Sequence, residues 1–242
     1  MPNIDRPTET TDRDPLSLLR SGEIEVLGRM PYSSNATFLV EISDATSSTR
    51  GIYKPLRGER PLWDFPPGLY KREIAAYIVS DRLGIDVVPP TVERDGPHGT
   101  GSVQLFIEAR FEEHYFTLFE AQDHLHDQFR KIAAFDIVAN NTDRKSGHCL
   151  IDTEDRIWAI DNGLCFSESF KLRTVIWEFG GEEIPAELLA SVDALANDPP
   201  SELDSLLSPD EITAMVERSR LLVAGARFPI DASGHRYPWP MV

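Results

Sequence analysis

Two aspartates, Asp143 and Asp161, stand next to hydrophobic segments in the second half of the chain. The residues between them predict a β-hairpin, with CLI (149–151) and IWAI (157–160) as strands and TED (153–155) as the turn. Such a hairpin places Asp143 before its first strand and Asp161 after its second, at the same end. Paired carboxylates suit phosphoryl transfer, because one orients the attacking hydroxyl while the other holds the metal ion that bridges the phosphates. The alternative is that both are ordinary turn residues, since Asp-Asn-Gly also forms turns well.

The wider motif carries a family resemblance. NTDR (141–144) followed by AIDNGLCF (159–166) resembles the catalytic loop and metal-binding turn of type II phosphatidylinositol 4-kinases, within the phosphatidylinositol 3-/4-kinase-like superfamily. The Asn-x-Asp-Arg element is also similar to HipA-type kinases and secretory-pathway kinases. Over most of its length, the chain resembles a kinase-like family of small actinobacterial proteins.

The resemblance implies roles for the residues of this stretch. Asp143 would be the catalytic residue, with Arg144 and Lys145 beside it, and Arg144 would neutralise a carboxylate or the phosphates. Asp161 would hold Mg²⁺ or Mn²⁺. Protein kinases have a metal-binding Asn five residues after the catalytic Asp, and this chain has His148 there, which we expect to be the second metal ligand.

The first half of the chain predicts an antiparallel meander. A short helix (16–22) precedes three runs with the alternation of strands: 23–30, 36–42 and 50–56. In a kinase-like lobe the turn between the first two strands lies over the nucleotide phosphates, so we expect Ser33 and Ser34 to contact them. A plain hairpin loop is the alternative, because the turn has no glycine-rich signature.

Lys54 and Glu73 occur in the order in which kinases place a phosphate-binding pair. Lys54 is the lone lysine of an apolar strand, and Glu73 lies nineteen residues later in a predicted helix, 69–84. We expect the carboxylate to hold the ammonium toward the phosphates of ATP. The alternatives are a snorkelling lysine at a sheet edge and an exposed glutamate.

Two further strands, 86–96 and 101–110, are expected to lead into the hinge that binds adenine through its main chain. The hinge residues are expected to be Phe106, Ile107, Glu108 and Ala109. A single long helix, 118–141, should pack behind the catalytic loop and bring Asp136 to it. Two more helices are predicted at 184–197 and 208–228, the second with a capping box that begins at Ser208.

Composition limits the partners. Of the 242 residues 41% are hydrophobic and 26% charged, as in ordinary globular proteins, and the net charge is −16. Nucleic acids and anionic membranes attract basic surfaces, so neither is an expected partner. No apolar run reaches the roughly 20 residues that span a bilayer, and the first residues lack the apolar core of a signal peptide, so we expect a cytoplasmic protein. The two cysteines are expected to be buried thiols.

These observations predict an α+β, two-lobed kinase-like fold with a small antiparallel-sheet N-lobe and a mostly helical C-lobe. The expected divisions are a flexible N-terminus (1–15), the N-lobe (16–110) and the C-lobe (111–242). The expected function is ATP-dependent phosphoryl transfer to a hydroxyl of a protein, polar metabolite or lipid. The resemblance implies a phosphoinositide, whereas the acidic charge favours a protein or a polar metabolite. The alternatives are a nucleotide-binding pseudokinase with a regulatory role and an AMP transferase.

Overall fold

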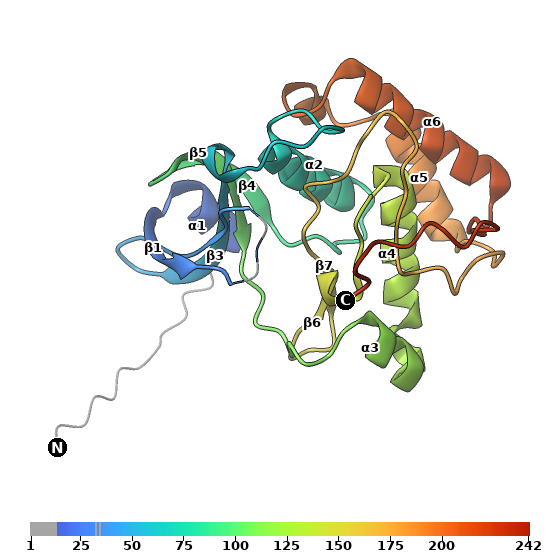
Figure 1. Ribbon diagram of the computed structural model, residues 1–242, viewed down its shortest axis with the longest axis horizontal. Helices are drawn as coiled ribbons and strands as arrows, with labels where there is room; N and C mark the ends of the chain where they lie inside the picture. The colour runs from blue at the N-terminus through green and yellow to red at the C-terminus, as the bar shows by residue number, and fades with distance from the viewer. Residues whose placement is uncertain (1–13, 32, 34) are drawn as a thin grey trace.

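A five-stranded antiparallel sheet makes up most of the N-terminal half of the molecule (Figure 1). The computed structural model describes residues 14–31, 33 and 35–242. The strand order is β1-β2-β3-β5-β4, and the bounds are β1 Glu23–Arg29, β2 Phe38–Ser43, β3 Ser48–Pro55, β4 Thr91–Gly96 and β5 Gly99–Leu105. The expected three-strand meander is therefore confirmed. The fourth strand begins later than expected, because Pro89 and Pro90 have no N–H group for a sheet ladder.

Two helices accompany this sheet. Helix α1 (Pro15–Ser21) is capped by Asp14, whose carboxylate accepts a hydrogen bond from Leu16 N–H at 3.1 Å. The flexible N-terminus was expected over 1–15, of which 1–13 lie outside the described residues, while Asp14 and Pro15 belong to the start of α1. Helix α2 (Leu69–Arg82) runs between the sheet and the rest of the molecule (Figure 1).

The C-terminal half is mostly helical. Its elements are α3 Tyr115–Ala121, α4 His126–Ala139, β6 Cys149–Ile151, β7 Ile157–Ala159, α5 Ala186–Asn197 and α6 Pro209–Gly225. Its hydrophobic core is larger than that of the sheet and includes Ala75, Ala76 and Val79 from α2. The smaller core lies under the sheet and includes Val40, Tyr53 and Val103. The molecule therefore has two lobes, with α2 packed into the core of the second.

The single helix expected over 118–141 is wrong, because the chain breaks between α3 and α4. Gln122 leaves the helix with φ −141°, and a 3₁₀ turn follows. His126 then folds back on α3, where its ring stacks on Phe119 with 4.2 Å between centroids and its Nε2 lies 2.9 Å from the Phe119 carbonyl oxygen. This interaction satisfies a carbonyl near the end of α3, which a continuous helix would have bonded to its own backbone.

Several local predictions are confirmed. Strands β6 and β7 pair in antiparallel register from Cys149↔Ala159 to Ile151↔Ile157, and Ser208 forms a capping box with Glu211 at the start of α6. Both cysteines are buried and unpaired, and burial raises the pKa of Cys149 to about 12. No helix within the described part of the chain is long and apolar enough to cross a membrane.

Candidate active site

Lys54, Glu73 and Asp161 meet between the two lobes. The Lys54 ammonium on β3 donates to Glu73 Oε1 and, at 2.9 Å, to Asp161 Oδ1. Glu73, on α2, is 2% exposed, and its other oxygen accepts the N–H of Asn162 at 3.0 Å. The expected lysine–glutamate ion pair is therefore present, and it is joined to the Asp-x-Gly turn. The Lys54 charge holds the pKa of Asp161 well below its usual range, so Asp161 is ionised at neutral pH.

A buried ion pair supports the catalytic loop from behind. Asp136, on α4, and Arg144 are both 0% exposed. The Arg144 guanidinium donates to Asp136 at 3.0 to 3.2 Å, to the Ile160 carbonyl at 2.7 Å and to Asn162 Oδ1 at 2.6 Å. The contact between Asp136 and the catalytic loop is as expected. Of the two roles expected of Arg144, it neutralises a carboxylate, that of Asp136. It faces the interior and does not line the pocket with the other expected catalytic residues, because its buried charge needs the carboxylate and carbonyls that surround it.

Two adjacent asparagines at the end of α4 also position the loop, and sequence reasoning gave their side chains no role. Asn140 ends the helix in the left-handed conformation with φ 51°, and its amide donates to the carbonyls of Ser167 and Ser169. Asn141 donates to Asp136 at 3.0 Å and accepts the N–H of Asp143 at 2.9 Å. The available signal was an Asn-Asn pair directly after a buried helix, because asparagine tolerates the left-handed conformation and bonds nearby backbone.

Asp143 projects from this loop toward the cleft. Its side chain is 27% exposed and forms an ion pair with Lys145, whose Nζ lies 3.3 Å from Asp143 Oδ2. Burial raises the pKa of Asp143, and the Lys145 charge opposes this shift. A partly buried carboxylate with a raised pKa is a better proton acceptor than an exposed one.

His148 and Asp161 face each other in a way that fits a divalent cation. His148 Nδ1 lies 2.9 Å from the Asp143 carbonyl oxygen, which only accepts hydrogen bonds, and 3.4 Å from the Lys145 backbone nitrogen, which only donates. The shorter contact favours the tautomer in which Nδ1 carries the proton. Burial lowers the pKa of His148 to about 4, so the ring is neutral and Nε2 is an unprotonated acceptor. Nε2 and Asp161 Oδ2 are 3.5 Å apart, and two acceptors this close call for a cation that both can contact. No group of three or more such ligand side chains occurs among the described residues, so phosphate and water oxygens would complete the coordination.

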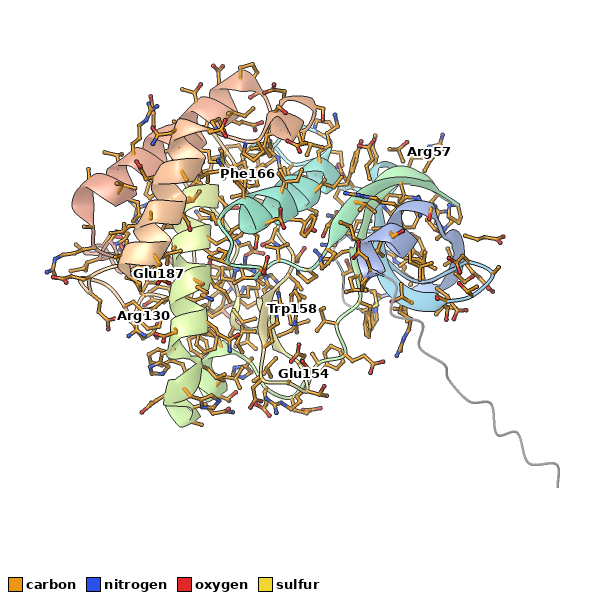
Figure 2. All side chains as sticks on the ribbon, turned by 180° about the vertical axis from the view of Figure 1, so that it is seen from behind. Arg57, Arg130, Glu154, Trp158, Phe166 and Glu187 are labelled. Atoms are coloured by element: carbon orange, nitrogen blue, oxygen red, sulfur yellow. The ribbon has the colours of Figure 1, made fainter. Side chains whose placement is uncertain are left out.

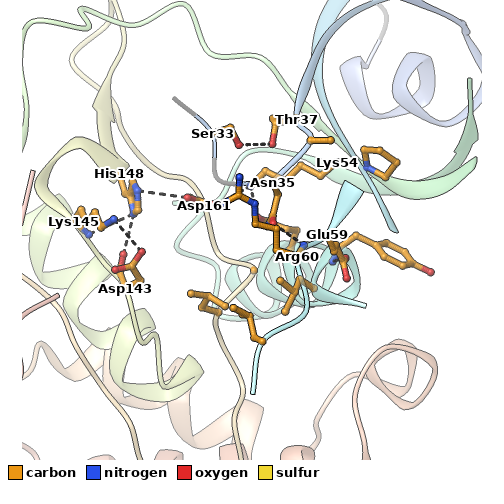
Figure 3. A pocket seen from close by; sticks show the side chains of 18 residues that line it. Ser33, Asn35, Thr37, Lys54, Glu59, Arg60, Asp143, Lys145, His148 and Asp161 are labelled. Atoms are coloured by element: carbon orange, nitrogen blue, oxygen red, sulfur yellow. Dashed lines mark hydrogen bonds and ion pairs between the residues drawn. The ribbon is translucent and has the colours of Figure 1, made fainter. Parts of the chain in front are cut away.

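A pocket of about 440 Å³ lies between the lobes, and we call it the polar pocket (Figure 3). Its lining includes Lys54, Glu73, Asp143, Lys145, His148 and Asp161. Asp143, Lys145 and His148 lie on one side of it, Glu59 and Arg60 on the other, with Asp161 between. A second cavity of about 260 Å³, the apolar pocket, adjoins it and is lined by side chains that include Ile52, Leu105, Phe106, Ile107, Leu150 and Ile160. The two share Ser33, Thr37, Lys54, His148 and Asp161, and therefore form one continuous cleft.

The residues predicted to bind the nucleotide from the N-lobe are only partly brought to the cleft. Ser33 lines both pockets, and its hydroxyl lies 2.8 Å from that of Thr37, whereas Ser34 lies outside the described residues. Phe106 and Ile107 line the apolar pocket, but the Phe106 N–H donates to the Arg50 carbonyl at 3.0 Å and is not free for a base.

The last two predicted hinge residues are turned away. Glu108 has a side chain that is 73% exposed and pairs with Arg50, and Ala109 forms a β-bridge with Asp152. Neither lines the apolar pocket. The physical reason is that the chain leaves the sheet after Leu105 and turns outward along the β6–β7 hairpin, which the sequence pattern alone did not show.

Comparison with known proteins places the chain in a family. No family model matches it. A protein of Mycobacterium tuberculosis, Protein Rv2133c, is 37% identical over 94% of this chain and 95% of its own length. The chain belongs to the family of that protein.

Solved structures show the fold. One of hydra Fam20 with sugar covers 87% of this chain and 86% of its own, with a TM-score of 0.53 and 14% identity. One of the Helicobacter pylori proinflammatory kinase CtkA covers 86% of this chain and 93% of its own, with a TM-score of 0.51 and 11% identity. The two-lobed kinase-like fold expected from the sequence is confirmed.

Proposed function

We propose that the protein is an ATP-dependent phosphotransferase that acts on an alcohol group. The observation that carries this proposal is the meeting of Lys54, Glu73 and Asp161 in one pocket, opposite Asp143. A lysine held by a buried carboxylate and an ionised aspartate supply the charges that phosphates and a divalent metal require. The adjoining apolar pocket has the size and lining for a nucleobase.

Each residue then has one task. Lys54 binds phosphate oxygens, and Glu73 keeps the ammonium in place. Asp161 and His148 would hold Mg²⁺ or Mn²⁺, which would neutralise charge on the transferring phosphate. Asp143 orients the acceptor hydroxyl and takes its proton as the oxygen bonds the γ-phosphorus, while the bond from that phosphorus to the bridging oxygen breaks and ADP leaves. The positive charge of Lys145 lowers the pKa of Asp143 and so favours its ionised form.

The acceptor is proposed to be a polar metabolite or a protein rather than a lipid. A net charge of −16 repels an anionic membrane surface. The motif resemblance to phosphatidylinositol 4-kinases supports a phosphoinositide instead, so both classes belong in an acceptor screen. The organised ion pairs of the cleft favour an active enzyme over a pseudokinase.

Incubation with ATP labelled at either the γ- or the α-phosphate tests the proposal. Transfer of label from the γ-position to an acceptor or to water is expected, and it should be lost in Asp161→Ala. Transfer from the α-position would instead establish an AMP transferase on this fold. Binding of ATP without release of either label, across the acceptor screen, would establish a pseudokinase.

A further inference from the structure

The segment 58–68, between β3 and α2, forms part of the wall of the polar pocket, and we call it the β3–α2 segment. Its start is tied to the turn between β1 and β2. The N–H of Ala36 donates to the Gly58 carbonyl at 2.9 Å, and the N–H of Arg60 donates to Asn35 Oδ1 at 2.9 Å. A Cβ at Gly58 would lie 2.6 Å from that of Ala36, so this close approach requires glycine.

The rest of the β3–α2 segment is held by both lobes. The Glu59 carboxylate accepts the N–H groups of Gly68 and Tyr70, at 2.8 Å each, where α2 begins. Asp64 pairs at 3.2 Å with Lys171, which belongs to the stretch after the Asp-x-Gly turn of the C-lobe. Because its start, middle and end are all anchored, the segment holds its backbone in a fixed position at the pocket.

Among the described residues that line the polar pocket, Arg60 is the cation whose side chain has no partner. Lys54, Arg60 and Lys145 all line the polar pocket (Figure 3), and the two lysines are paired with the carboxylates described above. The Arg60 guanidinium, by contrast, has no hydrogen bond or ion pair within residues 14–31, 33 and 35–242. An exposed, unpaired arginine beside a pocket rich in phosphate-binding groups is available to an anionic ligand.

The position of Arg60 in the cleft indicates which part of a bound nucleotide it would contact. Arg60 lines the polar pocket together with Asp143 but does not line the apolar pocket, where the base would lie. The terminal phosphate must lie near Asp143, since an acceptor hydroxyl is oriented there. In the β1–β2 turn, the N–H of Ala36 donates to the Gly58 carbonyl of the β3–α2 segment. This N–H is therefore not available to a phosphate oxygen.

We infer that Arg60 binds the terminal phosphate of ATP, and that the β3–α2 segment takes the part of the missing glycine-rich loop. This inference rests on the proposed function, because it presupposes a nucleotide in the cleft. The planar guanidinium presents paired donors that match two phosphate oxygens, and its fixed backbone aims them at one place. Arg60 thereby distinguishes ATP from ADP.

Calorimetric titration of wild type, Arg60→Ala and Arg60→Lys with ATP, ADP and AMP, at constant Mn²⁺, tests the inference. Arg60→Ala should weaken ATP binding about tenfold and ADP and AMP binding less than about twofold, as expected for loss of one charged contact. Arg60→Lys should fall between, because it keeps the charge but loses the paired donors. The matched control is Arg57→Ala, an exposed arginine beside the N-lobe sheet (Figure 2) that does not line the pocket and should bind all three nucleotides as wild type does.

The outcomes separate this inference from the proposed function. If Arg60→Ala binds ATP as wild type does, or loses ATP, ADP and AMP equally, Arg60 is not a ligand of the terminal phosphate, although nucleotide binding stands. If Arg57→Ala weakens ATP as much as Arg60→Ala, the effect is one of general charge and the inference is again wrong. A wild-type protein that binds none of the three nucleotides overturns both.

Discussion

The two walls of the cleft are built differently. On the C-lobe side, Asp136, Arg144 and Asn162 are fully buried, and each makes several hydrogen bonds behind the residues that face the pocket. On the N-lobe side, the β3–α2 segment has exposed side chains, including Trp63 at 95% exposure, and it is anchored by a few hydrogen bonds near its ends and one ion pair. The C-lobe wall therefore holds its pocket-facing residues through buried, multiply bonded side chains, whereas the N-lobe wall is held by fewer contacts at the surface.

The largest expected effects come from substituting the two aspartates of the C-lobe wall, Asp143 and Asp161. The two substitutions should impair different steps. Asp143→Ala should lower turnover by about 10³-fold with nucleotide affinity nearly unchanged, because in the proposed mechanism Asp143 contacts the acceptor hydroxyl and not the nucleotide. Asp161→Ala should abolish metal-dependent nucleotide binding as well as turnover. Turnover and calorimetric affinity of both variants provide the check. Near-normal turnover in Asp143→Ala would contradict the role given to it here.

The buried support of the C-lobe wall should matter more for stability than any residue of the N-lobe wall. Arg144→Met leaves the carboxylate of Asp136 buried without its ion pair, which should destabilise the protein by about 3–5 kcal/mol. Arg60→Met, at an exposed position of the N-lobe wall, should change stability by less than about 0.5 kcal/mol. Urea unfolding measures both. A loss under about 1 kcal/mol for Arg144→Met would mean that the network is not needed to hold the loop.

This difference between the walls also explains what the sequence could predict. The C-lobe site depends on short-range order, since Asp143, the β6–β7 hairpin and Asp161 follow one another within one motif. The Lys54–Glu73 pair could be predicted because a strand and a helix carry it in kinase order. The burial of Arg144 could not, because Asn-x-Asp-Arg has the same letters whether the guanidinium faces the phosphates or the core.

The contacts of the N-lobe wall have almost no counterpart in a short sequence motif. Arg60 lies in a proline-rich segment, and its anchor Asn35 is 25 residues away along the chain. The ion pair between Asp64 and Lys171 spans 107 residues. Two of the four expected hinge residues, Glu108 and Ala109, lie away from the apolar pocket for a similar reason: main-chain contacts to a base leave no side-chain pattern, so the hinge was assigned by order alone.

A middle-sized effect is expected at His148, which stands where protein kinases have asparagine. Mn²⁺ accepts an imidazole more readily than Mg²⁺, so it should support nucleotide binding at a concentration roughly tenfold lower. His148→Asn should narrow this gap while keeping function, and His148→Ala should weaken binding with both metals. Metal titrations of nucleotide affinity provide the measurement. Equal titrations with the two metals, unchanged in His148→Ala, would show that Asp161 and water hold the metal without the imidazole.

The smallest expected effect is at Lys145, whose charge lies 3.3 Å from Asp143 Oδ2. Burial raises the pKa of Asp143 and Lys145 opposes it, so Lys145→Met leaves the effect of burial with less opposition and raises this pKa further. Asp143 must be ionised to take a proton, so activity falls as the pH drops through its pKa. The acid limb of the rate profile should therefore move to higher pH in Lys145→Met, by about 0.5–1 unit for a partly exposed pair. Lys131→Met, which removes an exposed lysine away from the cleft, should leave that limb in place. If the limb stays put in Lys145→Met as well, the group that titrates is not Asp143, and the general-base role on the C-lobe wall must be assigned elsewhere.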